Sequence, residues 1–207
     1  MISIVNYKMG NIRSIQNALD FLEFDSRVID SPKGILTSKK LILPGVGSFR
    51  VAMEHIKSMG LFDALNEAVL EKKAPILGIC LGMQLLAIEG EEDGLTKGFG
   101  WVPGKVKHFP SKDFSLKIPH IGFNTVYFQN RTKNIFEGLN DHADFYFVHS
   151  YRMISEEPEK YVSSWANYGE KFAASVQYKN IFGTQFHPEK SQSNGLIVMK
   201  NFCRLNG

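Results

Sequence analysis

Cysteine is scarce in this 207-residue chain, and several other features are missing altogether. The two cysteines, Cys80 and Cys203, are too few for a disulfide framework, which favours a reducing, cytoplasmic compartment. No apolar run approaches the roughly 18 residues that a membrane-spanning helix needs. The first residues lack the basic region and cleavage site of a signal peptide. We therefore expect a cytoplasmic protein that has no membrane partner.

Charge of one sign is not in excess either. The 24 Lys and Arg residues and 21 Asp and Glu residues give a formal net charge of +3, without a run of five like charges. This balance argues against a nucleic-acid partner. The glycine-rich segment 43–48 lacks the Lys-Ser/Thr pair of a phosphate-binding P-loop, and no Cys or His pair has metal-ligand spacing. We expect no metal and no cofactor.

The composition that remains is that of an ordinary globular protein. Hydrophobic residues make up 43% of the chain and charged residues 22%. The length suits one domain with a single large core. We therefore treat residues 1–207 as a single domain.

Strand and helix patterns alternate over residues 1–90. Compact apolar runs predict strands, and apolar residues three or four apart predict helices. Continuous apolar strands between helices are typical of a parallel sheet that is covered on both faces. The expected strands are 2–6, 27–30, 41–43 and 76–79, and the expected helices are 12–22, 49–70 with an interruption near Gly60, and 83–88.

The second half of the chain has a different pattern, in which strand-like segments follow one another closely. Lys179 and Asn180 separate two apolar runs as a hairpin turn would, and Leu196 to Cys203 suggests a closing helix. The expected fold is α/β: an open, mostly parallel twisted sheet with helices on both faces and additional antiparallel strands. These later strands are expected at 101–109, 125–128, 144–152, 161–166 and 172–186.

The most informative segment is Gly78-Ile-Cys80-Leu-Gly82, which lies between an apolar strand and a helical pattern. It has the spacing of a nucleophile elbow, with Cys in place of the usual Ser. The sharp turn would lift the sulfur out of the sheet, and the following helix N-terminus would favour the thiolate. It would also offer the free N–H of Leu81 to an oxyanion. The alternative is a buried structural cysteine.

A cysteine nucleophile needs a base, and His187 is the candidate among six histidines. It ends the apolar run 181–186, and Pro188 restricts it to an extended backbone. Residues i and i+2 of an extended segment point the same way, so Glu189 could hold one imidazole nitrogen while the other faces Cys80. The alternative is a solvent-exposed histidine with an incidental glutamate.

Three segments together resemble the class I, or triad, glutamine amidotransferases: Leu43-Pro-Gly-Val-Gly47, Gly78-Ile-Cys-Leu-Gly-Met-Gln84 and Gln185-Phe-His-Pro-Glu-Lys-Ser191. Met9-Gly-Asn11, Pro119-His-Ile-Gly122 with Asn124, and Tyr146-Phe-Val-His-Ser-Tyr-Arg152 narrow the resemblance to the glutaminase subunits of imidazole glycerol phosphate synthase. The resemblance covers nearly the whole chain.

The resemblance implies a reaction at Cys80, His187 and Glu189. Cys80 would attack the side-chain amide of glutamine, and the thioester would be hydrolysed to glutamate after ammonia has left. The family pattern assigns the oxyanion and substrate contacts to Val46, Gly47, Leu81, Gln84, Ser150 and Tyr151.

The resemblance also implies a heterodimer with a cyclase subunit, a (β/α)₈ barrel that consumes the ammonia in histidine biosynthesis. The family pattern places Asn11, His120, Phe123 and Lys190 towards this partner. Ile121 and Phe123 stand where the family usually has Met and Trp, and the first turn also departs from the usual sequence. A paralogous glutaminase that supplies ammonia to a surface-sugar amidotransferase is therefore the alternative.

Two further classes compete with a partner-dependent glutaminase. A stand-alone cysteine hydrolase could share the triad, but Gln84 and the Phe147-Val-His-Ser-Tyr151 segment favour the glutaminase. A non-catalytic binding module would be indicated by the loss of Cys80, His187 or Glu189, and all three are present.

Overall fold

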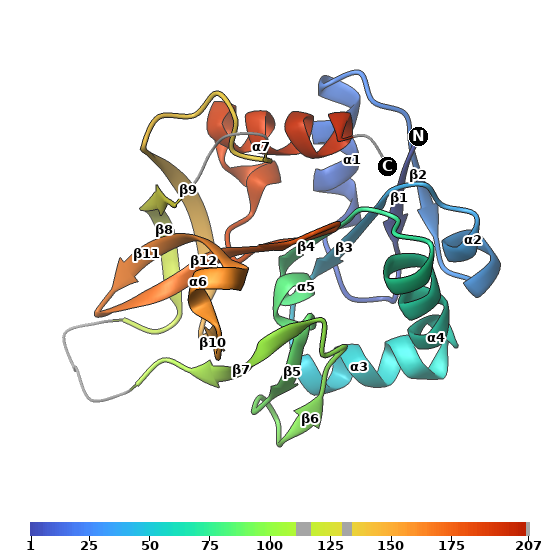
Figure 1. Cartoon of the computed structure of the whole chain (residues 1–207), viewed down its shortest axis with the longest axis horizontal. Coiled ribbons are helices and arrows are strands. Elements are labelled where there is room, and N and C mark those ends of the chain that lie inside the picture. Colours follow the sequence, from blue (N-terminus) through green and yellow to red (C-terminus); the bar gives the residue numbers. More distant parts are fainter. Residues whose placement is uncertain (111–116, 130–133, 206–207) are drawn as a thin grey trace.

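A nine-stranded sheet runs through the centre of the computed structural model, which describes residues 1–110, 117–129 and 134–205 (Figure 1). Five parallel strands form one half and four antiparallel strands the other. The strands in spatial order are β2 (Ser26–Ile29), β1 (Ile2–Val5), β3 (Leu41–Gly45), β4 (Ile76–Cys80), β13 (Ile181–Thr184), β12 (Glu170–Tyr178), β11 (Val162–Tyr168), β8 (His120–Phe128) and β9 (His142–His149).

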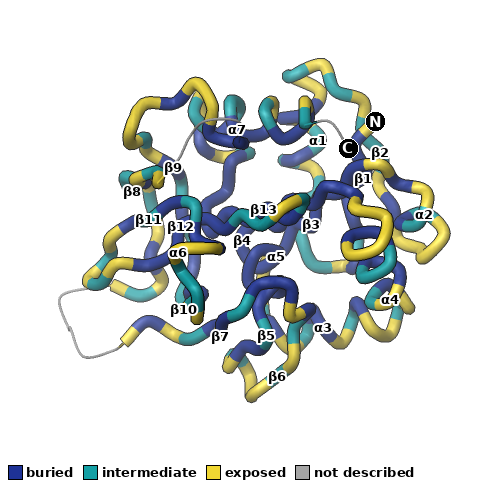
Figure 2. The backbone as a smooth tube through the Cα atoms, viewed as in Figure 1, coloured by how far each residue is buried: buried dark blue, intermediate teal, exposed yellow. Residues whose placement is uncertain are grey.

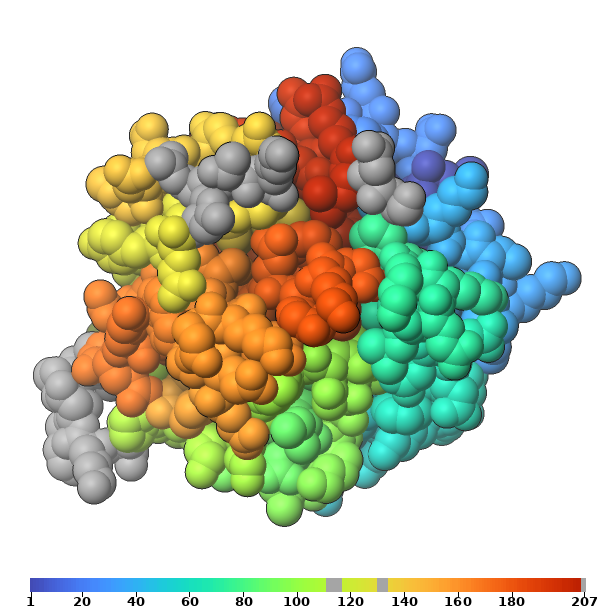
Figure 3. Space-filling view, in the orientation of Figure 1, coloured from blue at the N-terminus to red at the C-terminus, as the bar shows by residue number. Residues whose placement is uncertain are grey.

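The two halves of the sheet meet at β13. This strand pairs in parallel with β4 on one side and antiparallel with β12 on the other. The predicted turn at Lys179 and Asn180 joins β12 to β13, and Lys179 has a φ of 53°. On the face shown in Figure 3, the blue-to-teal N-terminal segments and the yellow-to-orange later segments occupy opposite sides of the molecule. The predicted mixed α/β fold is confirmed.

A second sheet of four strands lies beside the large one. Its order is β10 (Tyr151–Ser155), β7 (Val102–His108), β5 (Ala87–Gly90) and β6 (Thr96–Lys97). The prediction of one strand over 144–152 is therefore wrong. The chain leaves β9 of the large sheet at Ser150 and enters β10 of the small one.

Helices cover both faces of the parallel half. Helices α1 (Ile12–Phe21) and α7 (Gln192–Arg204) lie on one face, above the sheet in Figure 1. The other face carries α3 (Phe49–Ser58), α4 (Leu61–Asn66) and α5 (Leu81–Gln84). The remaining helical segments are α2 (Pro32–Leu36), α6 (Pro158–Tyr161), a π turn (Glu67–Glu71) and a 3₁₀ turn (Pro188–Lys190). Among the described residues, no helix is long and apolar enough to cross a membrane.

The two helical layers explain why the parallel strands are apolar on both sides. Leu41 and Leu43 point into the core under α3 and α4, whereas Ile42 between them points into the core under α1 and α7. All three side chains are fully buried, and strands β1, β3, β4 and β13 form the dark interior of Figure 2.

The helix predicted over 83–88 is wrong for most of its length. Helix α5 ends at Gln84, and β5 begins at Ala87. The carbonyl groups of Leu85, Leu86 and Ala87 accept hydrogen bonds from the backbone of residues 99–102. Pairing with this distant segment therefore overrides the helical pattern.

Candidate active site

Cys80 is the last residue of β4 and stands directly before α5. Its backbone has φ 55° and ψ −110°, a conformation that L residues rarely adopt and that is typical of strained functional turns. A Cβ atom on Gly78 would lie 2.6 Å from the Gly82 oxygen, and one on Gly82 would lie 1.8 Å from the Leu43 oxygen. The two flanking glycines are therefore required by close backbone packing around the elbow.

The sheet register brings two further segments to Cys80. Gly45 of β3 is the direct neighbour of Cys80, so the Val46–Gly47 turn begins beside the sulfur. Thr184 of β13 is the neighbour of Ile79, and the next side chain along, Gln185, has its Nε2 atom 3.7 Å from Cys80 Sγ. The carboxyl ends of three adjacent parallel strands thus converge on one point, where α/β sheets bind their ligands.

His187 and Glu189 follow β13 and lie together in the interior. His187 Nδ1 is 2.8 Å from Glu189 Oε1, and each side chain is only 2% exposed. The backbone of His187 is extended, as the following proline predicts. Ser191 Oγ donates to the His187 carbonyl oxygen over 2.6 Å and fixes the segment.

The second nitrogen of His187, Nε2, is buried and has no hydrogen-bond partner among the described residues. Burial alone lowers the pKa of His187, but the interactions with Cys80 and with Glu189 raise it to about 10. Cys80 and Glu189 both favour the charged ring, although no hydrogen bond of normal geometry joins the thiol to His187. Such contacts commonly tighten only when a substrate is bound. The charged, imidazolium form of His187 is therefore favoured beside the sulfur.

Several buried polar groups without a hydrogen-bond partner lie near Cys80. Across residues 1–110, 117–129 and 134–205, four buried side-chain atoms have no hydrogen-bond partner: Tyr7 Oη, Thr184 Oγ1, His187 Nε2 and Glu189 Oε2. Tyr7 Oη would lie 2.4 Å from a Cβ on Gly45, and Thr184 neighbours Ile79. Because leaving such groups unpaired costs stability, their concentration beside Cys80 marks a functional site.

A cavity of about 280 Å³ opens at Cys80, and it has two walls. The parallel half supplies what we name the glycine wall: Val46, Gly47, Cys80 and Leu81. The residue before β8, the end of β9 and the crossover into β10 supply the histidine wall: Pro119, Val148, His149, Ser150 and Tyr151. Gln84 and Glu92 complete the lining.

The cavity brings together all six residues predicted to hold the oxyanion and substrate: Val46, Gly47, Leu81, Gln84, Ser150 and Tyr151. The hydrogen bonds of Gln84 limit what its side chain can offer a ligand. Its amide nitrogen donates to the Tyr151 carbonyl oxygen and to Gln185 Oε1, both over 3.0 Å. Both N–H groups of Gln84 are therefore used, and only its oxygen is left for a ligand.

Glu92 and Gln185 belong to the site but were not predicted as site residues. Glu92 is the one carboxylate among the described residues of the cavity lining. Its Oε2 accepts from the Phe49 amide over 3.0 Å, and burial raises its pKa. The acidic run at Glu91-Glu92-Asp93 was its only signal in the sequence. Gln185 belongs to the motif that ends in His187, and only its contact with Cys80 shows its place.

The residues predicted to face a partner are not all on the surface. Asn11 and Lys190 are exposed, and Phe123 is 51% exposed. Phe123 packs against Tyr146 with ring centroids 5.7 Å apart, and Lys190 Nζ lies 5.8 Å from the same ring. His120, in contrast, is buried, with only 3% of its surface exposed.

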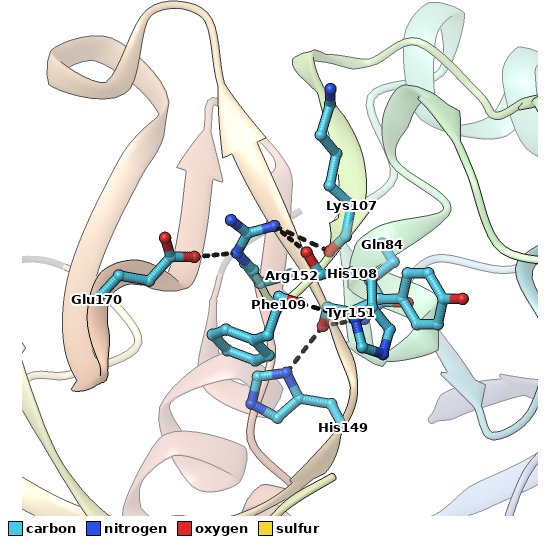
Figure 4. A network of polar contacts seen from close by, with 8 residues as sticks. All are labelled: Gln84, Lys107, His108, Phe109, His149, Tyr151, Arg152 and Glu170. Carbon is cyan, nitrogen blue, oxygen red and sulfur yellow. Dashed lines mark hydrogen bonds and ion pairs between the residues drawn. The ribbon is translucent and has the colours of Figure 1, made fainter. Parts of the chain in front are cut away.

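Arg152 joins the two sheets behind the histidine wall (Figure 4). It lies on β10 and pairs with Glu170 of β12, while its Nη1 donates to the carbonyl oxygens of Lys107 (3.1 Å) and His108 (2.7 Å) on β7. Its guanidinium also lies over the Phe109 ring, 5.3 Å from the centroid. This buried cation anchors the segment that carries Ser150 and Tyr151.

These groups can carry out nucleophilic catalysis. A thiol on a strained turn, a histidine held by a carboxylate, and a helix N-terminus beside the sulfur are the parts that acyl transfer requires. Over the described ranges, no three His, Cys, Asp or Glu residues are grouped so that they could hold a metal ion.

Comparisons with known proteins agree with this chemistry. Residues 3–204 match the family model "Glutamine amidotransferase class-I". The chain is 45% identical over 205 residues to the imidazole glycerol phosphate synthase subunit HisH 1 of Campylobacter jejuni (strain 81-176), covering 99% of this chain and 100% of that protein. It is 47% identical to the subunit HisH 2 of Vibrio vulnificus, covering 97% and 92%. A chain in the structure of PurLQS from Thermotoga maritima has the same fold, with a TM-score of 0.72, 19% identity and 97% and 96% coverage.

Proposed function

Because this chain belongs to the class I glutamine amidotransferases, and within them to the family of the imidazole glycerol phosphate synthase subunit HisH, we propose that it is the glutaminase subunit of that synthase in histidine biosynthesis. It hydrolyses L-glutamine to L-glutamate and ammonia, and the ammonia passes to a cyclase subunit. The observation that carries the proposal is that His187 and Glu189, which follow β13, lie beside Cys80 at the end of β4, where a cavity opens.

In the first half of the reaction, the Cys80 thiolate attacks the side-chain carbonyl carbon of glutamine. The carbonyl oxygen becomes an oxyanion, held by the N–H of Leu81 and by the Val46–Gly47 turn. The C–N bond then breaks, and the nitrogen leaves as ammonia with a proton from His187 Nε2. A γ-glutamyl thioester remains on Cys80.

In the second half, His187 removes a proton from a water molecule, which attacks the thioester. A second oxyanion forms and collapses, the C–S bond breaks, and glutamate is released with Cys80 restored. Glu189 accepts from His187 Nδ1 throughout, which fixes the tautomer and stabilises the imidazolium.

The cavity supports glutamine as the occupant. Glu92 supplies a carboxylate for the α-ammonium group, and the Ser150–Tyr151 segment supplies polar groups on the opposite wall. The Cys80 nucleophile has to stay a free thiol, which favours the cytoplasm as the working compartment.

We assign the partner surface to the exposed apolar side chains of β8 and its neighbours. Ile121 and Phe123 are 59% and 51% exposed, and Lys190 lies one residue after Glu189. A (β/α)₈ cyclase barrel seated here would receive ammonia without releasing it into bulk water, where protonation would destroy its nucleophilicity.

The test is glutamate release from glutamine by the chain alone and with the cyclase subunit of the same cell plus its nucleotide ligand. Strong stimulation by the liganded cyclase is expected. A lack of stimulation, with Cys80 still labelled by a glutamine analogue, would contradict the histidine-pathway role and point to another acceptor such as a sugar amidotransferase.

A further inference from the structure

Two histidines, His120 on β8 and His149 on β9, lie side by side behind the histidine wall. They are direct neighbours in the β8–β9 pair, and His120 Nδ1 lies 3.0 Å from His149 Nε2. Both are buried, and His149 also lines the cavity. The chemistry proposed for Cys80 uses neither ring, so this buried pair requires a separate explanation.

The partners of the two rings fix the positions of their protons. His149 Nδ1 lies 2.8 Å from the Tyr151 carbonyl oxygen, which only accepts, so His149 carries its proton on Nδ1. His149 Nε2 is then an acceptor, and His120 Nδ1 donates to it. The Asn124 amide donates to the Asn167 carbonyl oxygen (2.9 Å) and to His120 Nε2 (3.2 Å). Every hydrogen bond in this chain therefore points from Asn124 towards the Tyr151 carbonyl oxygen.

The surroundings keep both rings uncharged. His120 is stacked between Tyr168 and Phe147, with centroid distances of 4.0 and 4.9 Å. Burial lowers the pKa of His120 to about 4 and that of His149 to about 3. A proton added to either ring would also place two donors face to face. One proton arrangement is therefore strongly favoured.

The chain ends on an atom that the active site shares. The Tyr151 carbonyl oxygen also accepts from Gln84 Nε2 over 3.0 Å, and Figure 4 shows His149 and Gln84 both close to Tyr151. Gln84 donates in turn to Gln185 Oε1, and Gln185 Nε2 approaches Cys80 Sγ. An unbroken series of polar contacts thus runs from Asn124 to the sulfur.

The same atom lies at the crossover between the two sheets. The chain passes from β9 to β10 at Ser150, and the hydrogen bond from the His149 side chain to the Tyr151 carbonyl oxygen spans that residue. The bond therefore fixes the direction of the backbone that presents Ser150 and Tyr151 to the cavity.

We propose that His120 and His149 are positioning residues for glutamine hydrolysis, which hold the Tyr151 carbonyl oxygen and, through it, Gln84, Gln185 and the wall that receives the substrate. The inference rests on the proposed function, because it takes glutamine as the occupant. Neither ring gives up or takes a proton during the reaction.

The first test compares His120→Phe with His120→Asn. Phenylalanine keeps the aromatic stack but removes the donor to His149, whereas asparagine places an amide N–H near the position of Nδ1. The probes are the glutamine analogue 6-diazo-5-oxo-L-norleucine, with saturation kinetics, and iodoacetamide. For His120→Phe we expect the half-saturating concentration of the analogue to rise about tenfold, the value of one good hydrogen bond. The iodoacetamide rate should change less than about twofold, and His120→Asn should recover most of the loss.

Tyr168→Phe is the matched control. It leaves the ring stacked on His120 and removes a hydrogen bond of 2.6 Å to the Lys117 carbonyl oxygen, which is outside the chain of hydrogen bonds. It should bind the analogue like the wild type. Normal analogue affinity in folded His120→Phe, or an equal loss in His120→Asn, would overturn the proposal. A failure of the analogue to label wild-type Cys80 would instead count against the proposed function.

The second test needs no variant and no glutamine. In ¹⁵N spectra of the wild-type imidazole rings at pH 7, His120 and His149 should both be neutral, with the proton on Nδ1. A proton on Nε2 of either ring would contradict the chain of hydrogen bonds and overturn the proposal.

Discussion

The glycine wall of the cavity is held by backbone atoms in close contact, whereas the histidine wall is held by side-chain hydrogen bonds. In the first, Gly78 and Gly82 flank Cys80 because no Cβ fits between adjacent backbones. In the second, His149 reaches the Tyr151 carbonyl oxygen and is itself held by His120. The glycine wall therefore depends on backbone contacts among the adjacent strands β3 and β4 and helix α5, and the histidine wall depends on hydrogen bonds among β8, β9 and the crossover to β10.

This difference between backbone contacts and side-chain hydrogen bonds predicts how each wall responds to substitutions. A backbone contact cannot be relieved by side-chain rotation, so damage to the glycine wall should reach the fold. A hydrogen bond can be lost while the surrounding packing survives, so damage to the histidine wall should change function and pH dependence first.

The largest expected effect is that of Gly82→Ala, which attacks the glycine wall directly. The new methyl group would lie 1.8 Å from the Leu43 carbonyl oxygen, so β3 or α5 has to move. We expect a loss of more than about 3 kcal/mol in the free energy of unfolding, measured by urea titration. In the control Gly34→Ala the new methyl group meets only side chains, Ile29 at 3.2 Å and Ser31 Oγ at 3.3 Å, and stability should change by less than about 1 kcal/mol. Equal stability of the two variants would refute the requirement for close packing.

The next effect in size concerns His187 and Glu189, which belong to neither wall and act with Cys80 in the proposed reaction. His187→Asn removes the base and should lower kcat for glutamate release by about a thousandfold or more. Glu189→Gln keeps an acceptor for Nδ1 but loses its charge, and should cost about tenfold to a hundredfold. A larger loss in Glu189→Gln than in His187→Asn would reverse the assigned roles.

A smaller effect is expected on the stability of the protein when the pH is lowered, and it reports on the two buried histidines, His120 and His149. The folded-state pKa values of His120 and His149 lie near 4 and 3, below the value of about 6.5 in the unfolded chain. Between these values the unfolded chain binds protons that the folded chain does not. The stability is therefore fully present above about pH 6.5 and declines as the pH drops towards 3. Unfolding titrations from pH 7 to 4 should show a shallower decline in His120→Asn; parallel curves would count against this explanation.

The smallest expected effect is a gain in the stability of the protein. The Tyr7 hydroxyl is buried against Gly45 without a partner among the described residues, and burial raises its pKa well above the usual range, so it stays neutral. Tyr7→Phe removes an unpaired polar group beside Gly45, the residue before the glycine wall, and should raise the free energy of unfolding by up to about 1 kcal/mol in urea titration. A clear loss of stability would show that this wall also depends on a side-chain hydrogen bond.

The contrast between the walls also explains what the sequence could and could not predict. The elbow at Gly78-x-Cys80-x-Gly82 and the pair His187 and Glu189 were predictable, because their geometry depends on residues within a short segment. The alternation of strands and helices in the parallel half was predictable for the same reason. Each of these features is marked by a pattern in the local sequence.

The missed features depend on distant partners. The crossover at Ser150 was predicted as continuous strand, since nothing local distinguishes β9 from β10. His120 was placed towards a partner, although it is buried against Tyr168 and His149. Glu92 is held in the cavity lining by its contact with Phe49. Helix α5 ends at Gln84 because residues 99–102 bond the carbonyl groups of the three residues that follow it. Each of these outcomes is decided by tertiary contacts.

The most direct test of Cys80 as the nucleophile compares glutamate release from glutamine by the wild type, Cys80→Ala and Cys203→Ala, each with the cyclase subunit present. Burial raises the pKa of the Cys203 thiol to about 12, so this second cysteine is an inert internal control. We predict that Cys80→Ala still binds the cyclase but releases no glutamate, and that Cys203→Ala remains active. Turnover retained in Cys80→Ala would contradict the assignment.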